Sequence, residues 1–400
     1  MTPDSLAHLS GLKSSPAAKL GLDPAALDRL TAALQAQVDQ KLIPGASAMI
    51  FRHGAIGYAA KVGAARPDGT ALGDDTIFRI YSMTKPIVSL AAMQLVQEGR
   101  LLLSDPLAKF VPAFAHAKVG VEADGDVRLV DLKRPITIQD LLRHTSGLTY
   151  GFTGVSKVQK LYHASGAMRA DASAAEQCET LAALPLRFQP GEAWEYGHST
   201  DVLGRVVEIV DGERLGAALK RRIFDPLGMV DTAFYTPPEK LPRRAELQSV
   251  QTFKNWKVGL CDATEPPIFE AGGGGLLSTL PDYARFCAML IGGGALHGAA
   301  LIGPHVLRFM TANHLPADCS RKHFILAPGY GFGLGFAVRE EVGVTSVPGT
   351  VGEFNWGGAA GTAFWVAPGD GLFAILMMQT GDNGDLIRPM FRNMVYAALR

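Results

Sequence analysis

Cysteine is scarce in this sequence, and the cysteines that occur form no recognisable pattern. The four are widely spaced, without a Cys-x-x-Cys pair or nearby paired histidines: Cys178, Cys261, Cys287 and Cys319. Zinc sites and disulfide frameworks both depend on closely or regularly spaced cysteines. The sequence therefore suggests neither zinc nor a disulfide framework, and we expect no metal and no cofactor.

An excess of charge of one sign is also missing. Lysine and arginine together number 38, as do aspartate and glutamate, and no basic run stands out. Proteins that bind nucleic acid or anionic membranes usually carry a basic patch. We therefore expect no nucleic acid and no membrane as partner, and a small neutral substrate is easier to reconcile with the composition. The oligomeric state stays open.

Long apolar runs are absent as well. No window approaches the ~18 apolar residues of a membrane span. A signal peptide needs an unbroken apolar segment, but the first 30 residues contain Asp4, Lys13, Lys19 and Asp23. The expected location is the cytoplasm.

What the sequence does contain is enough apolar material for a large core. With 400 residues, 48% hydrophobic and 19% charged, it predicts a globular protein with one large domain or two subdomains. The clearest segments are a helix at 23–42, hairpin strands at 46–52 and 55–60, strands at 330–338, 362–366 and 372–378, and a helix at 386–399.

This order predicts the domain organisation. Strands and helices occur at both ends of the chain, and few strands are expected before about residue 240. We therefore predict a discontinuous α/β domain from residues 1–80 and 255–400, a mainly helical domain from residues 81–254, and a catalytic cleft between them.

The candidate nucleophile is Ser82, in the motif Ser82-Met-Thr-Lys85. A strand-like run at 76–80 breaks there and an apolar helical pattern begins. A hydroxyl and an amine three residues apart share one face of a helical turn, so Lys85 can draw on the serine proton. Pro86 has to lie in the opening turn, because deeper in the helix it would remove a hydrogen bond. Ser82 is therefore predicted at the helix mouth, where unpaired N–H groups and the helix dipole favour an oxyanion.

Two other serines offer competing interpretations. Ser10 and Lys13 have the same spacing, but no strand precedes them and no helical pattern directly follows, so we attribute this match to chance. Ser199, in Gly-His-Ser-Thr-Asp at 197–201, departs from the Gly-x-Ser-x-Gly elbow of α/β-hydrolases only at its last position. That elbow has to follow a buried strand, and the segment at 194–196 is too short and polar to be one.

Two segments of the helical part are expected to present side chains to the cleft. A helix that ends near residue 142 leads into a loop with His144 and Tyr150, and a Pro-Gly turn delivers Tyr196 and His198 just before another helix. We interpret His144 as a hydrogen-bonded structural histidine.

The strand region contributes a third segment, Trp356-Gly357-Gly358, followed by Ala359. The indole supplies an apolar wall. A glycine pair on a strand lets a ligand approach the backbone closely, so that a main-chain N–H can point at a substrate carbonyl, but the same pair can be a simple bulge. Both interpretations stay open.

In this order, the motifs at 82–85, 196–198 and 356–358 resemble those of the serine β-lactamase and penicillin-binding protein superfamily. The resemblance is closest to the carboxylesterases with a class C β-lactamase fold, known as family VIII esterases, and it covers nearly the whole chain. It implies an α/β fold with an antiparallel sheet flanked by the N- and C-terminal helices, plus an inserted helical domain.

The resemblance also implies roles for single residues. Ser82 would be the acyl-accepting nucleophile, Lys85 with Tyr196 the base pair, and the N–H groups of Ser82 and Ala359 the oxyanion hole. Lysine and tyrosine placed against each other can share a proton and accept that of the serine. The residues expected to contact substrate are Tyr150, His198, Trp356, Gly357 and Gly358.

The sequence departs from the family pattern at two positions. Trp356 stands where β-lactamases have a lysine that helps hold the substrate carboxylate, although Arg143 or Lys157 could serve a carboxylate instead. His198 stands where the middle motif usually ends in asparagine, and its role stays open. The first departure agrees with an esterase that prefers uncharged acyl chains.

We therefore expect a serine esterase that hydrolyses short-chain carboxylic esters through an acyl-enzyme on Ser82. The alternatives are a β-lactamase or acyltransferase of the same fold, or a penicillin-binding-like protein that is acylated once and stalls.

Overall fold

One large sheet organises the protein. The computed structural model describes residues 1–123, 125–167, 169, 171–247, 252–253, 256–257, 263–381 and 383–400. In spatial order the sheet consists of β1 (Lys13–Ser14), β3 (Ala55–Gly63), β2 (Gly45–Arg52), β16 (Leu372–Met378), β15 (Ala363–Ala367), β14 (Phe354–Gly357), β13 (Ala337–Arg339) and β12 (Tyr330–Phe332). The short β1 runs parallel to β3, and every other neighbouring pair is antiparallel. The predicted α/β class with an antiparallel sheet is confirmed.

The two ends of the chain meet in the middle of this sheet. β2 pairs with β16 from Ala46↔Met378 to Arg52↔Leu372, which joins the N-terminal strands to the C-terminal ones. The predicted hairpin of β2 and β3 is present, and its turn has positive φ at His53 and Gly54, as tight hairpin turns require. His53 is therefore a turn residue. The predicted hairpin of β15 and β16 also forms.

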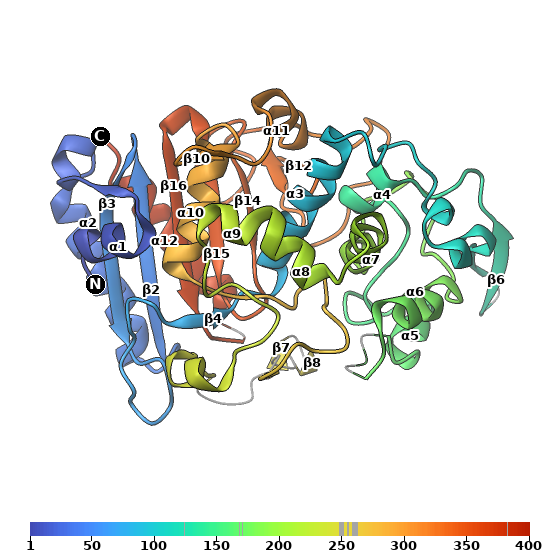
Figure 1. The fold of residues 1–400 in the computed structure, drawn as a ribbon, viewed down its shortest axis with the longest axis horizontal. Coiled ribbons are helices and arrows are strands. Elements are labelled where there is room, and N and C mark those ends of the chain that lie inside the picture. The colour runs from blue at the N-terminus through green and yellow to red at the C-terminus, as the bar shows by residue number, and fades with distance from the viewer. Residues whose placement is uncertain are drawn as a thin grey trace.

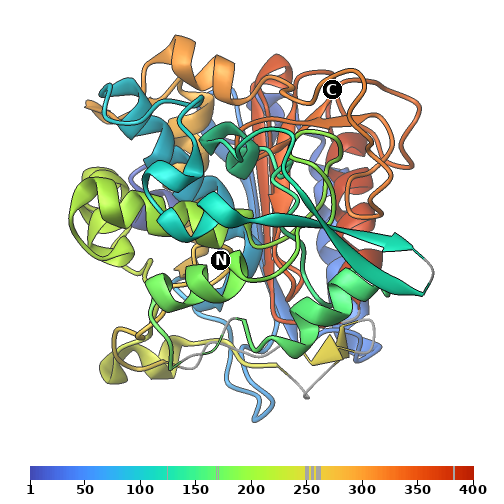
Figure 2. The same ribbon diagram turned by 90° about the vertical axis from the view of Figure 1, so that its right-hand side faces the viewer.

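Helices cover both faces of the sheet. α2 (Pro24–Asp39) and α12 (Gly384–Ala397) share one apolar cluster on one face, and the Asp23 carboxylate caps α2 by accepting from the Ala25 N–H at 3.1 Å. α1 (Pro3–Ser10) and α10 (Leu280–Ile291) pack on the other face, within the main core. Figure 2 shows the sheet nearly edge-on between these layers.

The middle of the chain is mainly helical and lies beside the sheet, away from the two termini (Figure 1). α3 is buried along most of its length and forms the centre of this region. The limits of the two domains, at 1–80 with 255–400 and at 81–254, stay a prediction. The helices are α3 (Thr84–Gln97), α4 (Ile138–Leu142), α5 (Lys157–Ala164), α6 (Ala174–Ala182), α7 (Ser199–Asp211), α8 (Leu215–Leu219) and α9 (Asp225–Leu227); α11 (Pro304–Met310) follows later.

Short strand pairs outside the main sheet complete the fold. β4 (Ile77–Arg79) pairs with β9 (Leu277–Thr279) directly before Ser82. The other pairs are β5 (Lys118–Ala123) with β6 (Asp126–Asp131), β7 (Thr252–Phe253) with β8 (Trp256–Lys257), and β10 (Ala295–Leu296) with β11 (Ala299–Ala300).

The β5–β6 ribbon lies in the mainly helical region, where few strands were expected. Its residues are largely exposed, and it projects from the body (Figure 2). One expectation about strands was wrong. The run at 330–338 is not one strand but a hairpin of β12 and β13. Gly335, at φ +103, allows this turn, and a Cβ there would lie 2.5 Å from Ser89 of α3.

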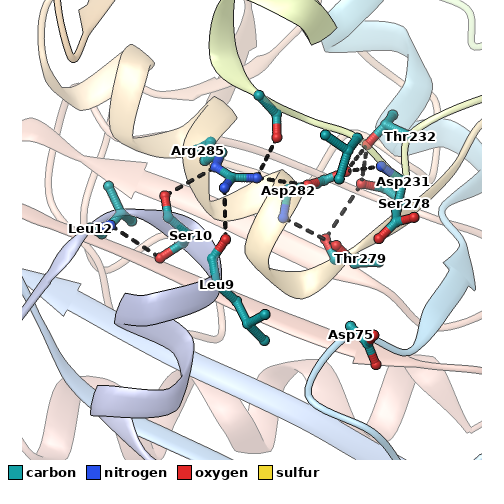
Figure 3. A network of polar contacts seen from close by, with 12 residues as sticks. Leu9, Ser10, Leu12, Asp75, Asp231, Thr232, Ser278, Thr279, Asp282 and Arg285 are labelled. Carbon is teal, nitrogen blue, oxygen red and sulfur yellow. Dashed lines mark hydrogen bonds and ion pairs between the residues drawn. The ribbon is translucent and has the colours of Figure 1, made fainter.

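The N-terminal helix is tied to α10 by one arginine (Figure 3). Arg285 donates to the carbonyls of Leu9 at 2.7 Å and Ser10 at 3.0 Å, and to that of Gly228, and pairs with Asp282 at 3.1 Å. The Ser10 hydroxyl donates to the Leu6 carbonyl at 2.6 Å and is buried. Ser10 is thus a structural residue.

None of the helices in the described part of the chain has the length and apolar character that crossing a membrane requires.

Candidate active site

Ser82 lies where a strand gives way to the central helix. After β4, the chain makes a single 3-10 turn, Tyr81–Met83, and α3 then begins at Thr84. Two bonds hold this turn: the Tyr283 hydroxyl of α10 donates to the Met83 carbonyl at 3.1 Å, and the Leu276 N–H donates to the Thr84 hydroxyl at 3.1 Å. Tyr81 has φ +43, an uncommon conformation for a bulky residue of the kind found at functional sites.

Lys85 points its ammonium group at three oxygen atoms. Its Nζ lies 3.3 Å from Ser82 Oγ, 3.2 Å from the Tyr150 hydroxyl and 2.5 Å from the Gly273 carbonyl. The side chain is only 1% exposed, so these acceptors replace the water that a buried ammonium group has lost. The spacing that the sequence indicated therefore does bring the amine to the serine hydroxyl.

Two tyrosines surround this lysine in different ways. Tyr150 accepts a hydrogen bond from Lys85, and burial, with Asp201 and Tyr196 nearby, raises the pKa of its phenol well above 10. Tyr150 is therefore a neutral phenol. The Tyr196 ring lies 4.5 Å from the Lys85 Nζ, and its hydroxyl accepts from the Trp356 indole at 3.3 Å. The indole therefore fixes the orientation of this hydroxyl at the cavity.

A buried carboxylate binds Gly273, the residue whose carbonyl accepts from Lys85. Asp201 of α7 accepts from the Gly273 N–H at 2.7 Å and lies 3.2 Å from His198 Nδ1. A Cβ at Gly273 would come within 2.7 Å of the Asp201 carboxylate, so only glycine fits there. From the sequence, Asp201 was interpreted only as the position at which this segment departs from the Gly-x-Ser-x-Gly elbow. The run of four glycines at 272–275 was the available signal for a close backbone approach.

The glycine pair of the third motif has a structural explanation. A Cβ at Gly358 would lie 2.3 Å from the Ile80 carbonyl, so glycine lets this segment pass against the chain that carries Ser82. The Gly361 N–H donates to the Gly358 carbonyl at 3.0 Å and closes a tight turn. Ala359 is the second residue of this turn, where the N–H takes no part in the turn's own hydrogen bond. Gly358 thus serves a close approach between two backbone segments.

A cavity of about 1310 Å³ connects these groups. Its walls are rich in aromatic and aliphatic side chains, and its described cationic residues are Arg388 and Arg392 of α12. Neither Arg143 nor Lys157 is among the described lining residues. The predicted site residues that line the cavity are Ser82, Tyr150, Tyr196, His198, Trp356, Gly357, Gly358 and Ala359.

The histidines near the site are buried. His144 packs between Tyr196 and Phe332, with ring centroids 5.1 and 5.4 Å away, and burial beside Lys85 lowers its pKa well below 6.5. This packing agrees with a structural role for His144, but the expected hydrogen bond is missing at Nδ1, which is buried without a partner among the described residues. His198 is 4% exposed and packs edge-on against Tyr150, so it positions the tyrosine and Asp201 and offers little surface to a ligand.

The competing serine at 199 lacks the required setting. Residues 194–196 form no strand, and the Ser199 hydroxyl is buried and hydrogen-bonded to Ser146 at 2.9 Å. An elbow has to present its serine at the end of a buried strand. The α/β-hydrolase alternative is therefore wrong.

Within the described residues, no group of three or more His, Cys, Asp or Glu side chains is placed to hold a metal ion. Cys178, Cys287 and Cys319 are buried free thiols, and Cys261 lies outside the described residues.

The chain is similar to known proteins over most of its length. The Beta-lactamase family model matches residues 30–398. A Mycobacterium tuberculosis (strain ATCC 25618 / H37Rv) protein is 34% identical over 364 residues, 88% of this chain and 90% of that protein. Esterase EstB of Burkholderia gladioli is 33% identical over 386 residues, 91% and 95%. The solved structure of EstCE1, a hydrolase with promiscuous acyltransferase activity, aligns with a TM-score of 0.79 and 25% identity over 93% of this chain and 99% of that one.

Proposed function

The chain belongs to the beta-lactamase family, and on this basis we propose that it is a serine esterase that hydrolyses short-chain carboxylic esters through an acyl-enzyme on Ser82. Its relatives include an esterase and a hydrolase with acyltransferase activity. The observation that carries the proposal is the contact of 3.3 Å between Ser82 Oγ and the buried Lys85 Nζ, at a cavity with apolar walls.

In the proposed reaction, Lys85 and Tyr196 share one proton between amine and phenol, and Ser82 Oγ attacks the ester carbonyl while its own proton passes to the unprotonated member of the pair. The N–H groups of Ser82 and Ala359 bind the oxyanion that develops. When the tetrahedral intermediate collapses, the same pair returns the proton to the leaving alcohol. Water then attacks the acyl-enzyme by the same route and releases the acid.

The polar groups around this pair have supporting roles. Tyr150, a neutral phenol, and the Gly273 carbonyl hold the Lys85 ammonium group in place, and Trp356 orients the Tyr196 hydroxyl while closing one side of the cavity. The partner is a small-molecule ester. The cavity walls offer an acyl chain mostly apolar surface, which supports an uncharged substrate.

Turnover of a short-chain p-nitrophenyl ester tests this proposal. An esterase releases many equivalents of p-nitrophenol per protein, and mass spectrometry of quenched reactions finds the acyl group on the peptide that contains Ser82. Release of a single equivalent would instead favour a penicillin-binding-like protein that stalls after acylation.

We expect Lys85→Ala and Tyr196→Phe each to reduce turnover by at least ~100-fold, the usual scale of a lost general base. Because the two residues share one proton-transfer task, the double variant should be no worse than either single one. Tyr150→Phe is the matched control: it removes a hydrogen bond to Lys85 from a phenol that lies outside the proposed base pair, so its loss should stay near ~10-fold. Steady-state kcat of the four variants checks this, and losses that multiply would indicate independent roles.

A further inference from the structure

Arg388 of the C-terminal helix holds the turn that contains Ala359. Its Nε donates to the Gly361 carbonyl at 3.2 Å, and its Nη2 donates to the Gly358 carbonyl. These two carbonyls stand at the first and last residues of the turn. One guanidinium group therefore bridges both ends of it.

The guanidinium fits into a slot formed by glycines. A Cβ at Gly357 would lie 3.4 Å from Arg388 Cζ, and a Cβ at Gly384 would lie 3.7 Å from it. Both are ordinary van der Waals contacts, so the guanidinium lies directly against both glycines. At Gly357 the nearest atom to a Cβ would be the Thr362 carbonyl oxygen at 3.1 Å, and at Gly358 it would be the Ile80 carbonyl oxygen.

The bond to Gly358 has a chemical consequence for Ala359. The Gly358 carbonyl and the Ala359 N–H are the two ends of one peptide group, and in a trans peptide they point in opposite directions. A donor on the carbonyl therefore directs the N–H away from Arg388. A charged donor also polarises the peptide, which makes its N–H a stronger donor in turn.

We infer that Arg388 is a positioning residue of the oxyanion hole, which orients and polarises the Gly358–Ala359 peptide so that its N–H binds the tetrahedral oxyanion. The inference rests on the proposed function, in which the Ala359 N–H has that task. Because a polarised N–H gains most when the acceptor carries a full negative charge, the effect is larger in the transition state than with the bound ester.

Contacts other than those of Arg388 also hold the helix in place. α12 packs through Ile387, Phe391 and Val395, which are fully buried, and the Asn383 side chain just before it donates to the Leu42 carbonyl at 2.7 Å. If Arg388 served only to attach α12, it would repeat what these contacts already do.

The test compares Arg388→Met and Arg388→Lys with Arg285→Met. Arg285 is a matched control, because it also donates to main-chain carbonyls but ties α1 to α10 outside the described cavity lining (Figure 3). The measurements are kcat and KM for a p-nitrophenyl ester, the Kd of phenylboronic acid, which forms a tetrahedral adduct with serine, and the thermal unfolding midpoint.

We expect Arg388→Met to lower kcat by ~30-fold, part of the 10²–10³-fold cost of losing an oxyanion donor, with KM changed less than ~3-fold. The boronic acid should lose affinity by a similar factor. Arg388→Lys should recover part of kcat, because an ammonium group can still donate to one carbonyl. Arg285→Met should lower the unfolding midpoint and leave kcat within ~2-fold.

An Arg388→Met protein that folds and keeps its kcat would overturn the inference. So would a loss that appears only in KM, or an equal loss of kcat in Arg285→Met. A parallel Ser82→Ala measurement separates the two proposals: if that variant stays active, the proposed function itself fails, whereas an inactive Ser82→Ala with an unaffected Arg388→Met refutes only the role of the arginine.

Discussion

Ser82→Ala is expected to reduce ester hydrolysis by at least ~10³-fold, because it removes the atom that forms the acyl-enzyme. Any remaining activity would come from binding and the oxyanion hole acting on water. The alanine should cost little stability, since the bond of this hydroxyl among the described residues is the one it accepts from Lys85, and the turn is held by Tyr283 and Leu276. Steady-state hydrolysis of a p-nitrophenyl ester, with thermal unfolding in parallel, measures both effects.

Two serines of the same chain are the controls. Ser199→Ala and Ser10→Ala each remove a buried hydrogen bond, to Ser146 and to the Leu6 carbonyl, and should lower stability by about 1 kcal/mol while retaining most of the activity. Loss of activity in Ser199→Ala, with activity kept in Ser82→Ala, would contradict the assignment of the nucleophile.

We expect short-chain esters to be hydrolysed with a kcat/KM at least ~10³ above that of a chromogenic cephalosporin, about 4 kcal/mol of discrimination. Trp356 offers an apolar face where the resemblance would place a lysine, so the cephalosporin carboxylate enters partly desolvated and without that partner. Two other cations that could serve the carboxylate are engaged in the protein: Arg143 binds Asp140 and the His314 carbonyl, and Arg388 binds two main-chain carbonyls.

Variants of Trp356 separate charge from hydrogen bonding. Trp356→Lys should reduce the difference in kcat/KM between the ester and the cephalosporin. It should do so mostly by weakening ester turnover, because it also removes the indole donor to the Tyr196 hydroxyl. Trp356→Phe removes the same donor without adding a charge, so it should weaken ester turnover while leaving cephalosporin turnover low. Comparable efficiencies for both substrates in the wild type would show that Trp356 does not set the preference and would indicate a lactamase with esterase side activity.

The sequence alone determined those features that depend on neighbouring residues. The spacing of Ser82 and Lys85 brings hydroxyl and amine together because it falls where a helical turn begins after a strand. The β2–β3 hairpin follows from its turn residues, and α2 follows from Asp23, Pro24 and a regular apolar face. These signals are local, because backbone geometry fixes which side chains share a face over a few residues.

Only the tertiary structure decided which groups complete the site, because they come from distant parts of the chain. Tyr150 and Gly273, which bind the Lys85 ammonium group, are 65 and 188 residues away from it, and Arg388 reaches a carbonyl 30 residues away. Main-chain carbonyls are present in every residue, so no sequence pattern marks the two that become acceptors here. The requirement for glycine at position 358 also depends on the tertiary structure, because it arises from the Ile80 backbone that packs against this residue.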